Sequence, residues 1–137
     1  MGHRRKAREH ALQGLYMHEV GKADVETIVQ FEWLDDEIPE EIREFAVTLI
    51  KGVVGNIEKL DSLISSYSKN WRPERLTAID KSILRLAIYE MLFIEDIPTV
   101  VTINESIELG KTFGGENSGQ FINGILDAVK KNELKEK

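Results

Sequence analysis

The sequence contains no cysteine, only three prolines and no uninterrupted run of eighteen apolar residues. The absence of cysteine excludes disulfide bonds, thiolate metal sites and a cysteine nucleophile. The absence of a long apolar run excludes a transmembrane helix, and the opening residues MGHRRKAREH lack the apolar core of a secretory signal. We therefore expect a cytoplasmic protein with no membrane partner.

Catalytic and metal-binding groups are also scarce. All three histidines fall within the first eighteen residues, so none lies elsewhere to partner a distant serine or aspartate. There is no HExxH pattern, and GKTFGG at 110–115 departs from the order of a phosphate-binding loop. Glu105 and Glu108 lie one helical turn apart and could act as general acid and base, but a solvated helix face is the favoured interpretation. We expect no metal, no cofactor and no catalysis.

The composition is that of one globular domain spanning residues 1–137, with 42% hydrophobic and 31% charged residues. Apolar residues recur at three- and four-residue spacing almost throughout, and no stretch alternates as a strand would. The sequence therefore predicts an all-α fold of six or seven helices. The main helices are expected at about 4–20, 24–34, 39–67, 78–94, 100–113 and 116–131, and the most apolar one, 78–94, should be the most buried.

Capping residues set several of these boundaries. Gly21 is expected to end the first helix, and Asp24 to cap a short second helix. Thr77 and Asp80 resemble a capping box, and Gly114–Gly115 should stop the helix before it. The buried stripe of the short second helix is expected to contain Ile28, Phe31 and Leu34.

The helix predicted over 39–67 is the longest in the chain. Its apolar stripe continues without interruption, so we expect one helix. Gly52 and Gly55 should bend it, because glycine costs roughly 1 kcal/mol in a helix interior.

The net charge of −6 is unevenly distributed. The first ten residues carry Arg4, Arg5, Lys6 and Arg8 against Glu9, a local charge of +3, so the rest of the chain carries −9. Arg4 and Arg8 share a helix face with Arg5 beside them, so three guanidiniums could line one ridge. Guanidinium pairs with phosphate and stacks on bases, which favours RNA. The alternative is a solvated, frayed terminus.

Three aromatic residues could support such a ridge. Tyr16 lies on the first helix, and Phe113 and Phe121 flank the segment 114–120. Single-stranded RNA is commonly bound by stacking its bases on rings beside a basic track. The alternative is that Phe113 and Phe121 belong to the core, and the position of Phe121 on an apolar stripe favours it.

Four sequence blocks resemble the NusB family of transcription antitermination factors. They are RRKAREHALQGLY at 4–16, DKSILRLAIYEMLF at 80–93, IPTVVTINESIELGKTFG at 97–114 and NSGQFINGILD at 117–127. The resemblance implies two packed three-helix bundles. It also implies binding to NusE, a ribosomal small-subunit protein, and to the boxA element of nascent RNA. The assembly would help RNA polymerase read through terminators, notably in ribosomal RNA operons, without catalysis or a cofactor.

The resemblance also implies roles for individual residues. Many relatives carry Asp in place of Asn117 and Lys in place of Gln120. The NusE-binding face would come from the middle helices, with Tyr67, Arg75 and Asp80 as candidates, and the acidic body suits a basic ribosomal protein. With the residues singled out above, the RNA-binding candidates are Arg4, Arg5, Lys6, Arg8, Tyr16, Phe113, Glu116, Asn117, Gln120 and Phe121.

Two other functions are compatible with the sequence. The chain could be a protein-interaction module or a homodimer whose interface hides the arginine ridge. It could also belong to an RNA-modifying enzyme, because NusB-like domains occur fused to RNA methyltransferase domains. The 137 residues leave no room for a cofactor-binding α/β domain, so we do not expect an enzyme.

Overall fold

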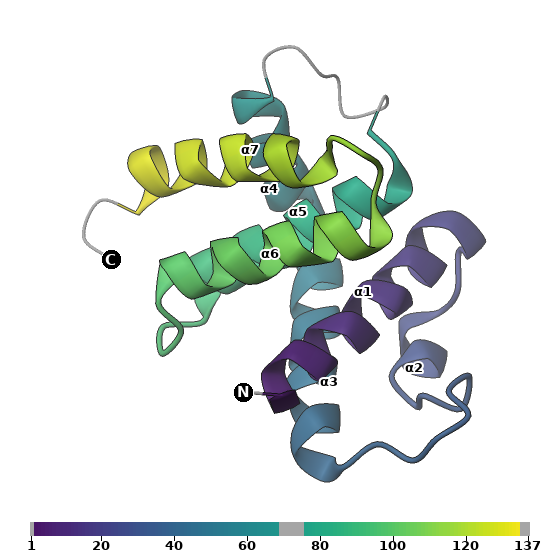
Figure 1. The fold of residues 1–137 in the computed structure, drawn as a ribbon. Helices are drawn as coiled ribbons and strands as arrows, with labels where there is room; N and C mark the ends of the chain where they lie inside the picture. The colour runs from purple at the N-terminus through teal and green to yellow at the C-terminus, as the bar shows by residue number, and fades with distance from the viewer. Residues whose placement is uncertain (1, 69–75, 135–137) are drawn as a thin grey trace.

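The computed structural model describes residues 2–68 and 76–134, and these residues form seven α-helices and no strand (Figure 1). The prediction of an all-α fold with six or seven helices is confirmed. Along the described part of the chain, no helix is both long and apolar enough to cross a membrane. The helices are α1 (Gly2–Gly21), α2 (Val25–Ile28), α3 (Glu40–Gly55), α4 (Ile57–Tyr67), α5 (Ala78–Phe93), α6 (Thr99–Phe113) and α7 (Ser118–Glu133).

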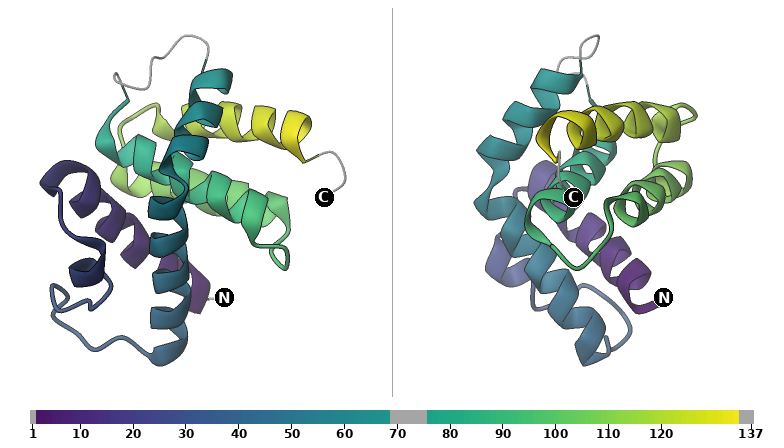
Figure 2. Two further views of the ribbon diagram at one scale, coloured as in Figure 1. Left: turned by 180° about the vertical axis from the view of Figure 1, so that it is seen from behind. Right: turned by 90° about the vertical axis from the view of Figure 1, so that its left-hand side faces the viewer.

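Helix α5 lies at the centre of the molecule. The sequence predicts this, because apolar residues occur on nearly all sides of the helix. Every residue from Ser82 to Ile88 is buried. Helices α1, α2 and α3 form one group and α4, α6 and α7 form another, and α5 packs against both (Figures 1 and 2). The two bundles that the family resemblance implies are therefore present as two groups that share α5.

Local hydrogen bonds explain most of the helix ends. The Thr77 hydroxyl accepts a hydrogen bond from the Asp80 backbone N–H at 3.0 Å, so the Thr77 half of the predicted capping box is confirmed. Asp80 Oδ1 has no hydrogen-bond partner among the described residues. Gly114 ends α6 in an extended conformation, and a Cβ there would lie 2.8 Å from the Gly110 carbonyl oxygen. At the end of α1, however, the left-handed residue is Lys22, with φ of 56°, and Gly21 is still helical.

The short second helix is smaller than predicted. It ends at Ile28, and Phe31 takes a left-handed conformation with φ of 58°. Ile28 and Phe31 are both buried, as expected. Phe31, however, lies in the turns that follow the helix and not on the helix itself. The Trp33 indole N–H donates to the Ile28 carbonyl at 2.9 Å, which satisfies a carbonyl at the point where the helix stops. At the helix start, Asp24 takes the N-cap position but makes no side-chain capping bond.

The single helix predicted over 39–67 is in fact two helices, α3 and α4, separated at Asn56. The Asn56 side-chain amide donates to the Gly52 carbonyl at 2.8 Å. An asparagine side chain that bonds the backbone in this way competes with helix continuation. The sequence predicts a bend near Gly52 and Gly55. The structure instead has a break between two helices, directly after Gly55.

Gly52 is required by the packing of α3 against α5. A Cβ at this position would overlap the Tyr89 ring, which itself stacks on Phe93 at 5.0 Å between ring centroids. We expect Gly52→Ala to lower the free energy of unfolding by about 1–3 kcal/mol, because the ring must move out of its packed position. Chemical denaturation measures this, with Gly55→Ala as the control.

The control works because a Cβ at Gly55 meets no atom within 4 Å. Gly55→Ala should leave the stability unchanged or raise it slightly, since alanine restricts the unfolded chain. Equal stabilities for the two variants would contradict the assigned contact between Gly52 and Tyr89.

Candidate nucleic-acid interface

The basic residues near the N-terminus lie on the first two turns of α1, which pack beside α5 and α6. We call Arg4, Arg5, Lys6 and Arg8 the basic head. Each of these cations faces a carboxylate, although only two of the four pairs are well shielded from solvent on the carboxylate side. The pairs are Arg4 with Asp96, Arg5 with Glu105, Lys6 with Glu9, and Arg8 with Glu90.

Arg8 is enclosed between helices rather than exposed on a ridge. Its Nε and Nη2 atoms donate to the two carboxylate oxygens of Glu90, each at 2.8 Å, and the Thr102 hydroxyl donates to the same carboxylate at 3.2 Å. The Arg8 and Glu90 side chains are only 4% and 1% exposed. The prediction that three guanidiniums line one exposed ridge is therefore wrong for Arg8, because α5 supplies a buried counter-charge that the spacing on α1 does not reveal. In this conformation Glu90 holds two of the Arg8 nitrogen atoms, and Arg8 Nη1 faces Glu105.

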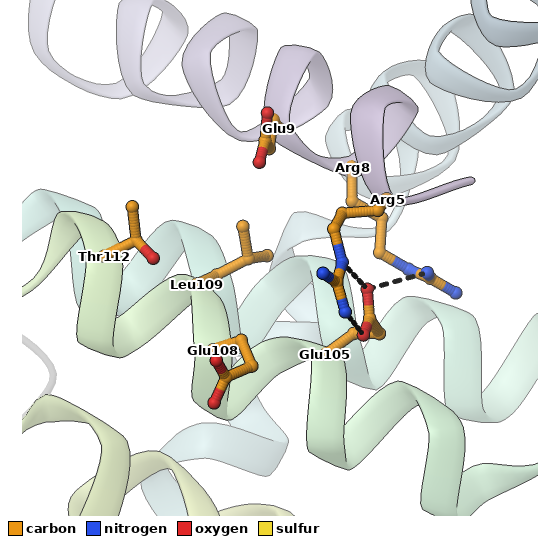
Figure 3. Close-up of a pocket in the computed structure, with 7 residues that line it drawn as sticks. All are labelled: Arg5, Arg8, Glu9, Glu105, Glu108, Leu109 and Thr112. Atoms are coloured by element: carbon orange, nitrogen blue, oxygen red, sulfur yellow. Dashed lines mark hydrogen bonds and ion pairs between the residues drawn. The ribbon is translucent and has the colours of Figure 1, made fainter. Parts of the chain in front are cut away.

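Arg5 is exposed and is held by a carboxylate of α6. Its Nε and Nη2 atoms donate to the two oxygens of Glu105 at 3.0 and 2.7 Å, which leaves the Nη1 hydrogens outside this pair (Figure 3). The hydrogen bond from Arg5 lowers the pKa of Glu105, and the same bond raises the pKa of Arg5. Arg8 Nη1 also lies 3.8 Å from Glu105. Glu105 is therefore ionised and oriented by arginine.

The pair of acids on α6 is not a uniformly solvated face. Glu105 is largely shielded, whereas Glu108 is exposed and lies 3.5 Å from Lys111. The prediction of a solvated face is thus correct for Glu108 and wrong for Glu105. Both line a small cavity of about 110 Å³ between α1 and α6, together with Arg5 and Thr112 (Figure 3).

Arg4 lies at the outer end of the basic head. Its guanidinium is centred 5.1 Å from the Phe45 ring centroid and donates to Asp96 at 3.0 Å. Lys6 lies 3.5 Å from Glu9 one turn along the same helix. Such exposed pairs contribute about 0–1 kcal/mol, so Arg4 and Lys6 remain able to bind an incoming anion. Arg5 keeps its Nη1 group outside its bidentate pair with Glu105.

The aromatic residues differ in exposure. Tyr16 and Phe113 are each 39% exposed, so a core role does not describe either side chain. Phe121 is half-buried and packs against the core, as the alternative interpretation predicts. The remaining candidates at the start of α7, all exposed, are Glu116, Asn117 and Gln120.

A hollow joins the basic head to the end of α6. Its volume is about 470 Å³, and Lys6, His10 and Gln13 of α1 line it together with Phe113. Burial lowers the pKa of His10, which favours the neutral imidazole there. The structure thus brings Lys6 and Phe113, which are far apart in the sequence, to one surface.

Of the predicted partner-binding residues, Tyr67 and Asp80 lie within the described part of the chain. The Tyr67 hydroxyl donates to Glu133 at 2.5 Å, and this hydrogen bond raises the pKa of Tyr67. The Asp80 backbone N–H donates to the Thr77 hydroxyl that caps α5, as described above. Arg75 lies outside the described residues.

A second cluster of charges lies where α1, α4 and α5 meet. Arg85 donates to both oxygens of Asp61 and to Glu19, in each case at 2.8 Å, and Lys81 donates to Glu19 at 3.1 Å. Burial opposes the charge on Arg85, but the hydrogen bonds to Asp61 and Glu19 outweigh it and raise its pKa. The hydrogen bond from Arg85 lowers the pKa of Glu19 to about 2. This cluster was not predicted from the sequence.

Glu19 should make stability depend on pH. Because its pKa falls from 4.5 to about 2 on folding, its contribution is present above pH 4.5 and is lost as the pH falls toward 2. The shift corresponds to about 3 kcal/mol at most. Denaturation at pH 6 should show Glu19→Gln less stable than the parent chain by about 2 kcal/mol, with the difference shrinking below pH 4. Glu58→Gln, at an exposed site, is the control. A constant difference across this range would contradict the assignment.

Three carboxylates of the interface were not identified as arginine partners from sequence, namely Glu90, Asp96 and Glu105. For Glu90 a signal was present, because a carboxylate on the most apolar helix must find a counter-charge when it is buried. Within residues 2–68 and 76–134, no group of three or more histidine or carboxylate side chains is placed to hold a metal ion. The geometry is that of a surface on which cations of α1, each paired with a carboxylate, lie near an exposed aromatic ring.

Comparison with known proteins identifies the family of this chain. The model of the NusB family matches residues 5–131. The transcription antitermination protein NusB of Syntrophus aciditrophicus is 48% identical, covering 99% of this chain and 88% of that protein. The corresponding protein of Elusimicrobium minutum is 47% identical, covering 96% and 95%.

Solved structures show the same fold. The structure of T. maritima NusB is 43% identical and superposes with a TM-score of 0.87, covering 94% of this chain and 91% of that one. A crystal structure of antitermination factors NusB and NusE in complex with dsRNA gives a TM-score of 0.79 at 26% identity, covering 96% and 98%. The family model, the identities over nearly the whole length and the shared helical fold together show that the chain belongs to the NusB family.

Proposed function

We propose that this chain is a transcription antitermination factor that binds boxA RNA of nascent transcripts, notably of ribosomal RNA operons, together with NusE. The observation that carries the proposal is the surface formed by Arg4, Arg5 and Lys6 of α1 next to the exposed ring of Phe113. Guanidinium and aromatic groups are the side chains that bind single-stranded RNA. Relatives of this chain carry the name transcription antitermination protein, and one related structure contains NusB, NusE and RNA.

In this proposal the chain acts as one non-catalytic domain in the cytoplasm and delivers RNA and NusE to the RNA polymerase antitermination complex. The body outside the first ten residues carries a charge of −9, which suits a basic ribosomal protein. Tyr67, Arg75 and Asp80 remain the candidates for the NusE-binding face. Because the basic head holds few charges, and each is paired with a carboxylate, we expect weak RNA binding by the chain alone and tighter binding by the complex.

The proposal is tested by titrating a boxA RNA with this chain, with NusE and with their mixture, using fluorescence anisotropy at several salt concentrations. The mixture should bind more tightly than either protein, and its affinity should fall as salt rises. Light scattering with and without RNA reports whether the chain forms a homodimer that RNA dissociates. A mixture that binds no better than its components would overturn the proposal.

A further inference from the structure

A groove of about 560 Å³ lies between the start of α1 and the first turns of α6. Three arginines of α1 line it, namely Arg4, Arg5 and Arg8. It is also lined by the apolar side chains of Ile97, Pro98 and Val101 and by the Glu105 carboxylate, with which Arg5 pairs. Its volume falls within the range of about 300–1,000 Å³ that is typical of ligand sites. None of the candidate residues from the sequence lies on its apolar side.

The two sides of the groove differ in chemistry. Ile97 is buried, whereas Val101 is 41% exposed on the surface of α6. Opposite them stand two guanidiniums whose carboxylate partners leave part of each group accessible. A planar group with apolar faces and an adjacent negative charge fits both sides at once. A nucleotide of single-stranded RNA has this form, since its base stacks on guanidinium planes and apolar side chains while its phosphate pairs with arginine.

The groove is continuous with the interface described above. Arg5 lines the groove and also the small cavity that Thr112 lines, and Thr112 is followed directly by Phe113. A single strand that follows the seam between α1 and α6 would therefore pass Arg5 with the groove at one end of its path and the Phe113 ring at the other.

We propose that this groove is a nucleobase subsite, in which one unpaired base of the bound RNA lies against Val101 and Pro98 and its phosphate pairs with Arg4 or Arg5. This inference rests on the proposed function and adds to it a contact outside the basic and aromatic residues. The subsite extends RNA recognition to the segment that joins α5 to α6.

Two neighbouring substitutions on α6 test the subsite. Val101→Asp places a carboxylate on the apolar side of the groove, and Val100→Asp places the same charge on a residue that is 54% exposed and does not line it. Both positions are exposed, so neither variant should lose its fold. With the NusE complex and boxA RNA, Val101→Asp should weaken binding at least tenfold, and Val100→Asp less than threefold. Equal effects of the two variants would overturn the subsite.

An abasic scan identifies the base itself. RNAs that each lack one base are titrated against the complex of NusE with the parent chain and with the Val101→Asp variant. One abasic position should weaken binding to the parent by about tenfold, in the range expected when one base no longer stacks, and should have little further effect on the variant. A scan in which every position weakens both complexes equally would overturn the subsite.

The outcomes separate this inference from the proposed function. If Arg5→Ala weakens RNA binding and Val101→Asp behaves like Val100→Asp, only the subsite is wrong. If no variant alters RNA binding, the proposed interface itself is wrong. If Val101→Asp weakens association with NusE and leaves RNA binding by the assembled complex unchanged, the groove binds protein and the nucleobase assignment is overturned.

Discussion

Replacing Arg8 with methionine is expected to lower the free energy of unfolding by about 3–5 kcal/mol, because it leaves the buried Glu90 carboxylate without its counter-charge. For a domain of this size, the loss corresponds to a fall in melting temperature on the order of 10–20 °C. Thermal and chemical denaturation measure both quantities. Arg4→Met is the matched control, since Arg4 forms an exposed pair and its loss should cost less than about 1 kcal/mol.

A double substitution distinguishes a lost charge pair from lost packing. Arg8→Met combined with Glu90→Leu removes both charges and keeps the volume apolar, so it should recover most of the stability or exceed that of the parent chain. If the double variant were as unstable as Arg8→Met alone, the loss would come from packing and not from an unpaired carboxylate. If Arg8→Met were as mild as Arg4→Met, the buried pair would not have the assigned role.

The second large effect concerns RNA affinity. Arg5→Ala is expected to weaken binding of boxA RNA to the NusE complex by about ten- to a hundredfold, because a charged hydrogen bond contributes about 1.5–3 kcal/mol. The slope of log Kd against log salt should fall by about 0.7 for each phosphate of a single strand that the variant no longer binds. Lys51→Ala is the control, since Lys51 is exposed on α3 and faces Glu26 rather than the basic head. Fluorescence anisotropy at several salt concentrations measures both changes.

Glu105→Gln should act in the opposite direction. A phosphate that approaches Arg5 must compete with the Glu105 carboxylate, which holds two of the donor atoms of that arginine. Removing its charge should tighten RNA binding by about three- to tenfold. Arg5→Ala removes the arginine and also leaves the Glu105 carboxylate unpaired. The variant with both Arg5→Ala and Glu105→Gln removes that carboxylate charge as well, so comparing the two variants separates these contributions to RNA affinity. Weaker binding by Glu105→Gln alone would mean that Glu105 positions Arg5 for RNA instead of competing with it.

The parts of the fold that depend on local pattern were predictable from sequence. Helix α5 is buried all around because its apolar residues cover most of its circumference, and Thr77 caps it through a contact three residues away. The break at Asn56 and the left-handed Phe31 were not predicted, because helical periodicity continues past both positions. Side-chain bonds to the backbone lie at both positions, from Asn56 to Gly52 and from Trp33 to Ile28, and helical periodicity does not report such bonds.

In the candidate site, too, local spacing predicts some features, and contacts with distant residues determine the others. The spacing of Arg4 and Arg8 correctly places them on one side of α1, but it does not say which part of that side meets another helix. Contact with Glu90 on α5 makes Arg8 internal, whereas Arg4 stays at the surface. Exposure of a charged residue is set by partners distant in sequence, so residue type and spacing alone could not separate a binding arginine from a buried one.

The pair formed by Arg8 and Glu90 also has a consequence for synthesis on the ribosome. Its members are 82 residues apart, and Thr102 completes the arrangement still later in the chain. An emerging α1 therefore has no counter-charge with which to bury Arg8, and its first turns must stay hydrated until most of the chain has left the exit tunnel. Helix α1 can pack against α3 before α5 is made, but a product truncated before α5 would leave Arg8 without its counter-charge.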